Sequence, residues 1–252
     1  MTVIFERTPA VIGHRGLGSG TLTPPGGTSS VVENTLPSML AAVEAGASWV
    51  EIDVTRTADD RLVLRHDPTT PEGDHVVELP AEATGLPLLE EIFEGLPAEV
   101  AVDVDVKTVL EDATDDPSRR TGALLLPVLR REARRRRLLV TSFDPSLLVF
   151  LREELPGVPL GLLTWLRFPL WHAVPAAAGL GLQAVAPHTG SCGFEHPDTR
   201  LRPLERCVEQ AHKAGLDVVV WCPSAERAPD YKAAGVDAMV VNDVPGVLAA
   251  VR

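Results

Sequence analysis

Lysine and cysteine are scarce in this chain of 252 residues. Of its 23 basic residues only three are lysines, Lys107, Lys213 and Lys232, so a lysine inside a strand pattern stands out. The three cysteines are an odd number without CxxC spacing, which argues against a disulfide framework and against a zinc cluster. A reducing, cytoplasmic setting is therefore expected.

Long hydrophobic runs are also missing. No uninterrupted apolar stretch reaches the ~18 residues of a membrane span, and Met1 to Ala10 carries Glu6, Arg7 and Pro9 instead of the apolar core of a secretory signal. The formal net charge of −12 argues against nucleic-acid and anionic-membrane binding. A small-molecule partner remains, and the oligomeric state stays open.

Glycine and proline are abundant, 20 and 22 residues, while 45% of the chain is hydrophobic. Together these figures predict a sizeable core and many turns, and the length suits one large domain over residues 1–252. Nine short apolar runs are strand candidates: Ala10–Gly13, Trp49–Val54, Leu62–Leu64, Val100–Val106, Leu138–Thr141, Pro159–Leu163, Ala184–Ala186, Val218–Trp221 and Ala238–Val241.

Stretches with helical spacing follow many of these runs: Leu36–Ala45, Leu88–Phe93, Gly122–Arg136, Pro145–Glu154, Pro203–Ala214 and Ala225–Ala234. Strands that alternate with helices predict a parallel sheet, and at this length a (β/α)8 TIM barrel is the leading architecture. Nine candidates exceed the eight strands of a barrel, so one is extra or misassigned. An open doubly wound sheet is the alternative, but no glycine-rich phosphate motif follows the first strand.

Ionisable residues interrupt the strand patterns near their ends. His14 and Arg15 follow the first run, and His66 closely follows the third. Glu51 and Asp53 share one strand face, because side chains alternate along a strand. Asp103, Asp105 and Lys107 likewise share one face of the fourth run. In a barrel this face points inward, and its carboxyl end is where active sites form.

Adjacent buried carboxylates need a compensating positive charge. Ligation by Glu51, Asp53 and one aspartate of the fourth run favours a hard cation, Mg²⁺ or Ca²⁺. His14 and His66 titrate near neutral pH and suit a general acid and a general base. Arg15 and Lys107 add fixed positive charge for an anion. This set describes a phosphodiester site.

The ordered motifs resemble those of the glycerophosphodiester phosphodiesterases. They are HRG (14–16), ENT (33–35), ExD (51–53), HDP (66–68), an acid-x-Lys strand (105–107), SFD (142–144), Trp221 and NDVP (242–245). The resemblance implies a TIM barrel of the PLC-like phosphodiesterase type that hydrolyses glycerophosphodiesters to glycerol 3-phosphate and an alcohol.

The resemblance also implies residue roles. His14 and His66 become the acid/base pair, Glu51 and Asp53 become metal ligands, and Arg15 contacts phosphate. Asp105 stands where the family usually has glutamate, and we expect it, not the deeper Asp103, to be the third ligand. Trp221 is expected to form an apolar wall against the glycerol. Cys222-Pro223-Ser224 departs from the family's usual Thr-x-Asn.

Two alternative functions remain at this stage. One is a lysophospholipase D-like enzyme, for which the cluster Trp165, Leu166, Phe168, Leu170 and Trp171 could line an apolar groove, although such clusters more often pack in a core. The other is a barrel that binds phosphodiesters but has lost turnover. Arg130–Arg137 is expected to be a solvent-facing basic helix end, and Leu17–Val32 a mobile surface loop.

Overall fold

The computed structural model describes residues 4–195 and 197–252. Eight parallel strands form its central sheet: β1 (Ala10–Gly13), β4 (Trp49–Arg56), β6 (Ala101–Val106), β7 (Leu138–Ser142), β8 (Leu160–Leu163), β9 (Ala184–Ala186), β10 (Asp217–Trp221) and β11 (Ala238–Val241). They follow one another around a ring, which closes because β1 pairs with both β11 and β4. The predicted TIM barrel is thus confirmed.

The ninth strand candidate lies outside this ring. β5 (Leu62–Leu64) pairs antiparallel with residues Val54–Arg56, the end of β4 that extends beyond the closed barrel. A further hairpin, β2 (Thr21–Leu22) with β3 (Val31–Val32), forms within the segment Leu17–Val32 that the sequence predicted to be a loop.

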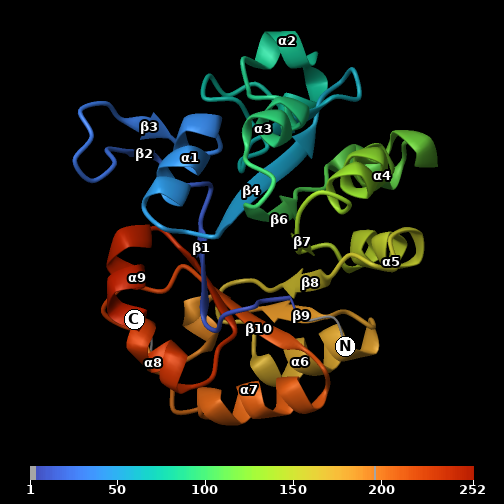
Figure 1. Cartoon of the computed structure of the whole chain (residues 1–252). Helices are drawn as coiled ribbons and strands as arrows, with labels where there is room; N and C mark the ends of the chain where they lie inside the picture. Colours follow the sequence, from blue (N-terminus) through green and yellow to red (C-terminus); the bar gives the residue numbers. More distant parts are fainter. Residues whose placement is uncertain (1–3, 196) are drawn as a thin grey trace.

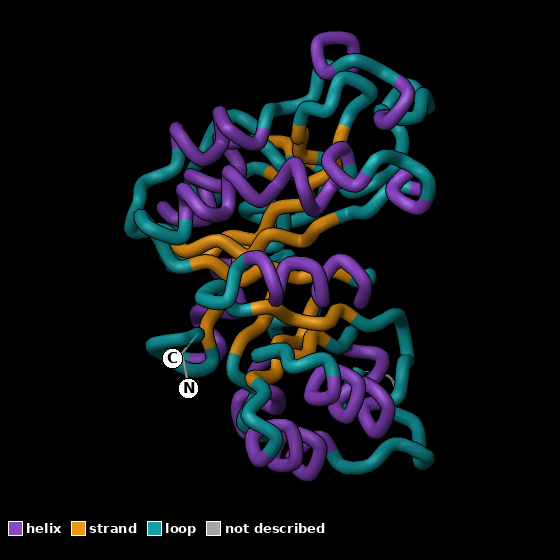
Figure 2. Tube along the Cα trace, turned by 90° about the vertical axis from the view of Figure 1, so that its right-hand side faces the viewer, coloured by secondary structure: helices purple, strands orange, loops and turns teal. Residues whose placement is uncertain are grey.

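Helices surround the strands (Figures 1 and 2). They are α1 (Leu36–Glu44), α2 (Ala81–Thr84), α3 (Leu89–Gly95), α4 (Thr121–Glu132), α5 (Pro145–Glu154), α6 (Leu170–Gly179), α7 (Leu204–Lys213), α8 (Ala228–Ala233) and α9 (Val244–Val251). Side chains of Thr35, Asp144 and Asp243 accept hydrogen bonds from the first-turn amides of α1, α5 and α9, as N-caps do. None of the described helices combines the length and apolarity needed to cross a bilayer.

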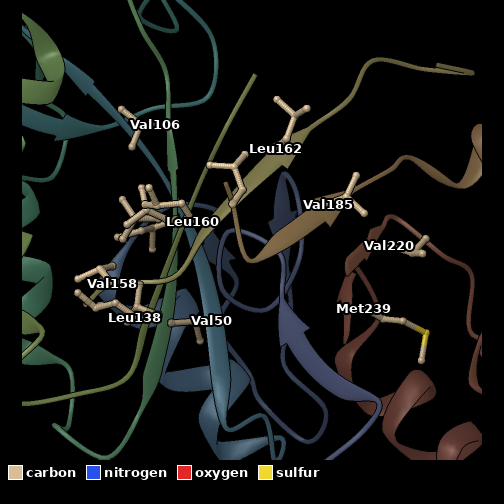
Figure 3. Packing of buried hydrophobic residues seen from close by; sticks show 14 of the residues in the cluster. Val50, Val106, Leu138, Val158, Leu160, Leu162, Val185, Val220 and Met239 are labelled. Carbon is tan, nitrogen blue, oxygen red and sulfur yellow. The ribbon is translucent and has the colours of Figure 1, made fainter. Parts of the chain in front are cut away.

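The larger hydrophobic core lies between the strands and the helices. Figure 3 shows outward-facing strand residues of this layer, among them Val50, Leu160, Val185 and Met239. A second, smaller core lies inside the barrel. Trp49, Ala101 and Leu139 are buried in it, and Phe5 packs on Trp49 with ring centroids 5.2 Å apart.

The inner face of the barrel changes character along its strands. On β4 the apolar Trp49 is followed on the same face by Glu51 and Asp53, and on β6 Ala101 is followed by Asp103 and Asp105. The register places Glu51 beside Asp103 and Asp53 beside Asp105. The barrel is therefore apolar at the amino ends of its strands and acidic toward their carboxyl ends.

The expectation that Arg130–Arg137 faces solvent is wrong for Arg136. Its side chain is fully buried, and Nε donates to Glu132 Oε2 at 2.9 Å. Its two terminal nitrogens donate to the carbonyls of Phe93, Leu96, Pro97 and Val100. Helix α4 ends at Glu132, so the chain turns inward before β7, and Arg136 satisfies carbonyls that would otherwise be unpaired.

Candidate active site

A tight turn follows β1 and carries the first two site residues. Arg15 and Gly16 both adopt positive φ, 53° and 95°. A Cβ on Gly16 would lie 2.5 Å from the Ser38 hydroxyl, so the position requires glycine. The turn directs the Arg15 backbone amide to Glu51 Oε2, a 2.8 Å hydrogen bond.

Three predicted ligands, Glu51, Asp53 and Asp105, lie together inside the barrel. Each offers an oxygen within 4.8 Å of the oxygens of the other two, and all three residues are buried. Asp103 lies one level deeper, where it accepts a 2.9 Å hydrogen bond from the Thr141 hydroxyl. It is therefore held apart from the cluster.

Two cationic side chains form ion pairs with this acidic cluster. Arg15 Nε lies 3.1 Å from Asp53 Oδ2, and its guanidinium also pairs with Glu33. Lys107 lies 3.0 Å from Asp53 Oδ1 and also pairs with Asp105. Asn34 adds support, since its Nδ2 donates to Asp53 Oδ2 and its Oδ1 accepts from the Asp53 amide.

The pKa values within the cluster diverge because the positive charge is shared unevenly. Burial and the neighbouring carboxylates raise the pKa of Glu51 well above its usual value. Burial raises the pKa of Asp105 to about 6, although Lys107 opposes the shift. For Asp53, Lys107 and Arg15 outweigh burial and hold its pKa below the usual value.

The donor set fits a hard divalent cation. Three carboxylates face two cationic side chains, and Arg15 also pairs with Glu33, so at least one negative charge is uncompensated when all are ionised. Asp105 Oδ1 is buried and has no hydrogen-bond partner in the described chain. Such an oxygen is costly to bury unless something positive binds it. Glu51, Asp53 and Asp105 could hold Mg²⁺ or Ca²⁺ through oxygen.

Each predicted catalytic histidine has a hydrogen-bonded partner at Nδ1. His66, just beyond β5, lies 2.8 Å from Asp67 Oδ1, and its electrostatic effect reaches Asp53 and Asp105. His14, just beyond β1, lies 2.7 Å from Asn242 Oδ1. The two rings thus belong to the same end of the barrel but have partners of different charge.

An aromatic wall borders the acidic cluster. Phe143 stacks on Trp165 with centroids 4.5 Å apart and meets the edge of Trp221 at 6.1 Å. Trp221 in turn contacts His188 at 4.3 Å, and its indole nitrogen donates to the Ala186 carbonyl. Lys107 Nζ lies 5.6 Å from the Phe143 centroid, so the wall adjoins the charged residues.

A cavity of about 530 Å³ opens beside these residues. Its lining includes His66, Lys107, Phe143 and Trp165, together with η1 (Val76–Glu78) and Leu110. Apolar side chains therefore form much of the wall next to the charged centre.

The apolar cluster after β8 is not core packing, apart from Leu170. Trp165 is 67% exposed and Leu166 63% exposed, and Phe168 and Trp171 are also exposed. Leu170 alone is buried, as the first residue of α6. Trp165 also lines the cavity, so it adds an exposed apolar side chain to the rim of the site.

Several residues of this site were not predicted as functional. Asp67, Phe143 and Asn242 were noted only as parts of motifs, yet they contact His66, Trp165 and His14 respectively. Their common signal is position, since each lies within three residues of a strand's carboxyl end. Residue type alone could not show which neighbour each would meet.

Residues 14–245 match the sequence profile of the Glycerophosphoryl diester phosphodiesterase family. The chain belongs to this family. Along its full length it is similar to a glycerophosphodiester phosphodiesterase of Caldanaerobacter subterraneus subsp. tengcongensis, at 24% identity over 96% of this chain and 97% of that protein. A shorter segment is 48% identical over 58 residues to a glycerophosphocholine phosphodiesterase of Schizosaccharomyces pombe. That segment spans 23% of this chain and 5% of the yeast protein's length.

Solved structures of other proteins share the fold. One is a glycerophosphodiester phosphodiesterase of Galdieria sulphuraria, with a TM-score of 0.75 at 24% identity over 96% of both chains. Another is a phosphodiesterase of Oleispira antarctica in complex with the product sn-glycerol-3-phosphate, with a TM-score of 0.73 at 23% identity over 96% of both chains. The barrel of this chain is thus the family's architecture.

Proposed function

We propose that this protein is a metal-dependent phosphodiesterase that hydrolyses glycerophosphodiesters to glycerol 3-phosphate and an alcohol. One observation carries the proposal: Glu51, Asp53 and Asp105 converge at the carboxyl end of a barrel that belongs to this family. The side chains of Arg15, Lys107, His14 and His66 belong to the same end. We propose that residues 1–252 act as a single domain. The free cysteines support a cytoplasmic location.

The contacts of each group support its proposed role. Arg15 and Lys107 hold positive charge beside the acidic cluster and would neutralise charge that develops on the phosphate. His14 and His66 exchange protons with the nucleophile and the leaving alcohol. Trp221 forms an apolar wall against the glycerol carbons.

Glu51, Asp53 and Asp105 would hold Mg²⁺ or Ca²⁺, which supplies Lewis-acid stabilisation of a phosphate oxygen. The nucleophile is either water or the glycerol 2-hydroxyl, which gives a cyclic phosphate that water then opens. Hydrolysis in ¹⁸O-labelled water, with trapping of a cyclic product, separates the two routes.

The deciding experiment is product analysis on a panel of glycerophosphodiesters, with and without divalent metal. We expect glycerol 3-phosphate and free alcohol, loss of turnover with EDTA, and recovery with Mg²⁺ or Ca²⁺. His14→Ala and His66→Ala should each lower turnover by about 10²–10⁴-fold with the melting temperature preserved. Near-normal turnover in either variant would remove that histidine from the mechanism. Binding of diesters without product would instead support a barrel that has lost turnover.

A second candidate substrate class is the lysophospholipids, which the exposed rim favours. Leu110, 87% exposed, and Trp165 both line the cavity, so an acyl chain could lie along apolar side chains there. Trp165→Ser should raise KM for lysophospholipids and leave short glycerophosphodiesters nearly unaffected. Trp171→Ser is the matched control, because Trp171 is exposed but does not line the cavity. Equal effects of Trp165→Ser on both substrate classes would argue against this candidate.

A further inference from the structure

Asn242 follows β11 directly, and its side chain faces the ring of His14. Asn242 Oδ1 lies 2.7 Å from His14 Nδ1. At this distance one of the two atoms must carry a proton, because two lone pairs would repel each other. The tautomer of His14 therefore depends on whether its Nδ1 or the facing Asn242 atom is the donor.

The Ser19 backbone amide determines the orientation of the Asn242 side chain. Ser19 N lies 3.1 Å from the same Asn242 atom, and a backbone N–H can only donate. That atom must be the carbonyl oxygen. The other arm of the amide agrees, since Nδ2 lies 3.7 Å from Cys222 Sγ, a weak acceptor. The same sulfur lies 3.8 Å from His14 Nδ1, much farther than the 2.7 Å to Asn242 Oδ1.

We propose that Asn242 is the positioning residue of His14. Its carbonyl accepts the Nδ1 proton, which holds the neutral ring in the Nδ1–H tautomer and leaves the lone pair on Nε2. The unprotonated nitrogen of His14 is then Nε2, and the ring can act as a general base through that atom. The assignment deepens the proposed function and rests on it for the catalytic role of His14.

The partner of the second histidine differs in charge. Asp67 Oδ1 accepts the Nδ1 proton of His66, and the hydrogen bond from this ring holds the pKa of Asp67 below its usual value. A carboxylate stabilises an imidazolium more than a neutral amide does. In both rings Nδ1 is thus the donor, and Nε2 is the nitrogen left to exchange protons.

The segment before β2 braces this arrangement through two successive amides. Ser19 N donates to Asn242, and Gly20 N donates to Glu33, whose other oxygen pairs with Arg15. Gly18 makes the approach of this segment possible, because a Cβ there would lie 2.4 Å from the backbone carbonyl oxygen of Asn242. The supports of His14 and Arg15 are thus connected to one short stretch of backbone.

The first test reads the tautomer itself by long-range ¹H–¹⁵N NMR of the labelled protein, with His14→Gln identifying the ring's signals. We expect the Nδ1–H form of His14 in the wild type. Asn242→Leu should convert it to the Nε2–H form that free imidazole prefers, and Asn242→Asp should retain Nδ1–H. An Nε2–H ring in the wild type would overturn the proposal. This readout needs no turnover, so it stays informative if the proposed function fails.

The second test is kinetic. Asn242→Leu should lower kcat by about 10–100-fold with KM nearly unchanged, as loss of a histidine's orienting partner does. Asn242→Asp should restore most of the lost kcat, because it keeps the acceptor. Asp243→Ala is the matched control, since Asp243 caps α9 through Gly246 without contacting His14. It should lower the melting temperature and leave kcat unchanged. Equal kcat for wild type and Asn242→Leu would refute the positioning role.

Discussion

Two clusters of buried charge lie at opposite ends of the barrel, and they differ in balance. At the amino ends of β6 and β7, Arg136 donates all five of its N–H groups to Glu132 and four backbone carbonyls. At the carboxyl ends, the cationic side chains that the structure places against Glu51, Asp53 and Asp105 are Arg15 and Lys107. Asp105 Oδ1 has no hydrogen bond within residues 4–195 and 197–252.

Burial of a charged side chain does not by itself identify a functional site. A buried charge whose hydrogen bonds are all made within the chain stabilises local structure, as Arg136 does for the segment before β6. A cluster that leaves one negative charge and buried oxygens uncompensated is poised for a ligand of the opposite sign. The two ends differ in how completely their buried charges are paired within the chain, and not in how deeply those charges are buried.

The largest effect should come from Asp105→Asn, which removes the uncompensated charge. Turnover should fall by roughly 10³-fold, because metal-dependent stabilisation amounts to several kcal/mol. The metal-free protein should become slightly more stable, since burial already raises the pKa of Asp105 to about 6. Kinetics over a metal titration and thermal melts in EDTA measure the two effects.

The matched control for that change is Asp103→Asn, one level deeper on the same strand face. It should alter metal dependence much less than Asp105→Asn. The reverse ranking would identify Asp103 as the ligand.

Next in size is Arg136→Met at the balanced end. It leaves Glu132 Oε2 and four carbonyls without their donor, so we expect a loss of about 3–5 kcal/mol in the free energy of unfolding. kcat/KM of the folded protein should not change. Arg135→Met, at a half-exposed side chain, should cost within about 0.5 kcal/mol. Urea unfolding measures the free energy of unfolding of both variants. A loss under 1 kcal/mol for Arg136→Met would contradict the stabilising role of Arg136.

The smallest effect concerns the pH dependence of stability. Burial raises the pKa of Asp103 from 3.8 in the unfolded chain to about 8 in the native protein. Its stabilising contribution is therefore complete below pH 3.8 and is lost as the pH rises toward about 8. Relative to wild type, Asp103→Asn should gain about 1–3 kcal/mol between pH 5 and 7.

This gain is measured by urea unfolding at several pH values in EDTA, which excludes metal effects. Glu72→Gln, at an exposed acid, serves as the control and should show no such trend. A constant difference between Asp103→Asn and wild type across this range would show that Asp103 is ionised in the native protein.

Much of the barrel was predictable because its strands are buried on both faces. Apolar runs such as Ala184–Ala186 and Ala238–Val241 coincide with strands of the structure, and the surplus run Leu62–Leu64 is the strand outside the ring. Helices α6 and α9 were not predicted. The apolar stretch before α6 resembled a loop, and no separate helical pattern was identified after β11.

At the site, the alternation of strand side chains was enough to place Glu51 and Asp53 on one face. It could not place Asn242 against His14, because they are 228 residues apart and meet only through ring closure between β11 and β1. Nor could it reveal that Arg136 is buried, since a run of arginines at a helix end is usually solvated. Contacts between turns that are far apart in the sequence depend on the folded structure and cannot be predicted from local patterns.

The segment that follows β5 leaves the barrel and returns to nearly the same point. Leu64 N donates to the Pro87 carbonyl at 2.9 Å, and Val63 pairs with Leu88. Neither junction belongs to the ladder that closes the barrel, yet the segment carries His66 and the η1 wall of the cavity. Loops with adjoining ends tolerate replacement. Beyond the HDP tripeptide, residues 69–87 thus leave and rejoin the barrel beside β5, so substitutions in η1 could change the cavity wall without altering a barrel strand.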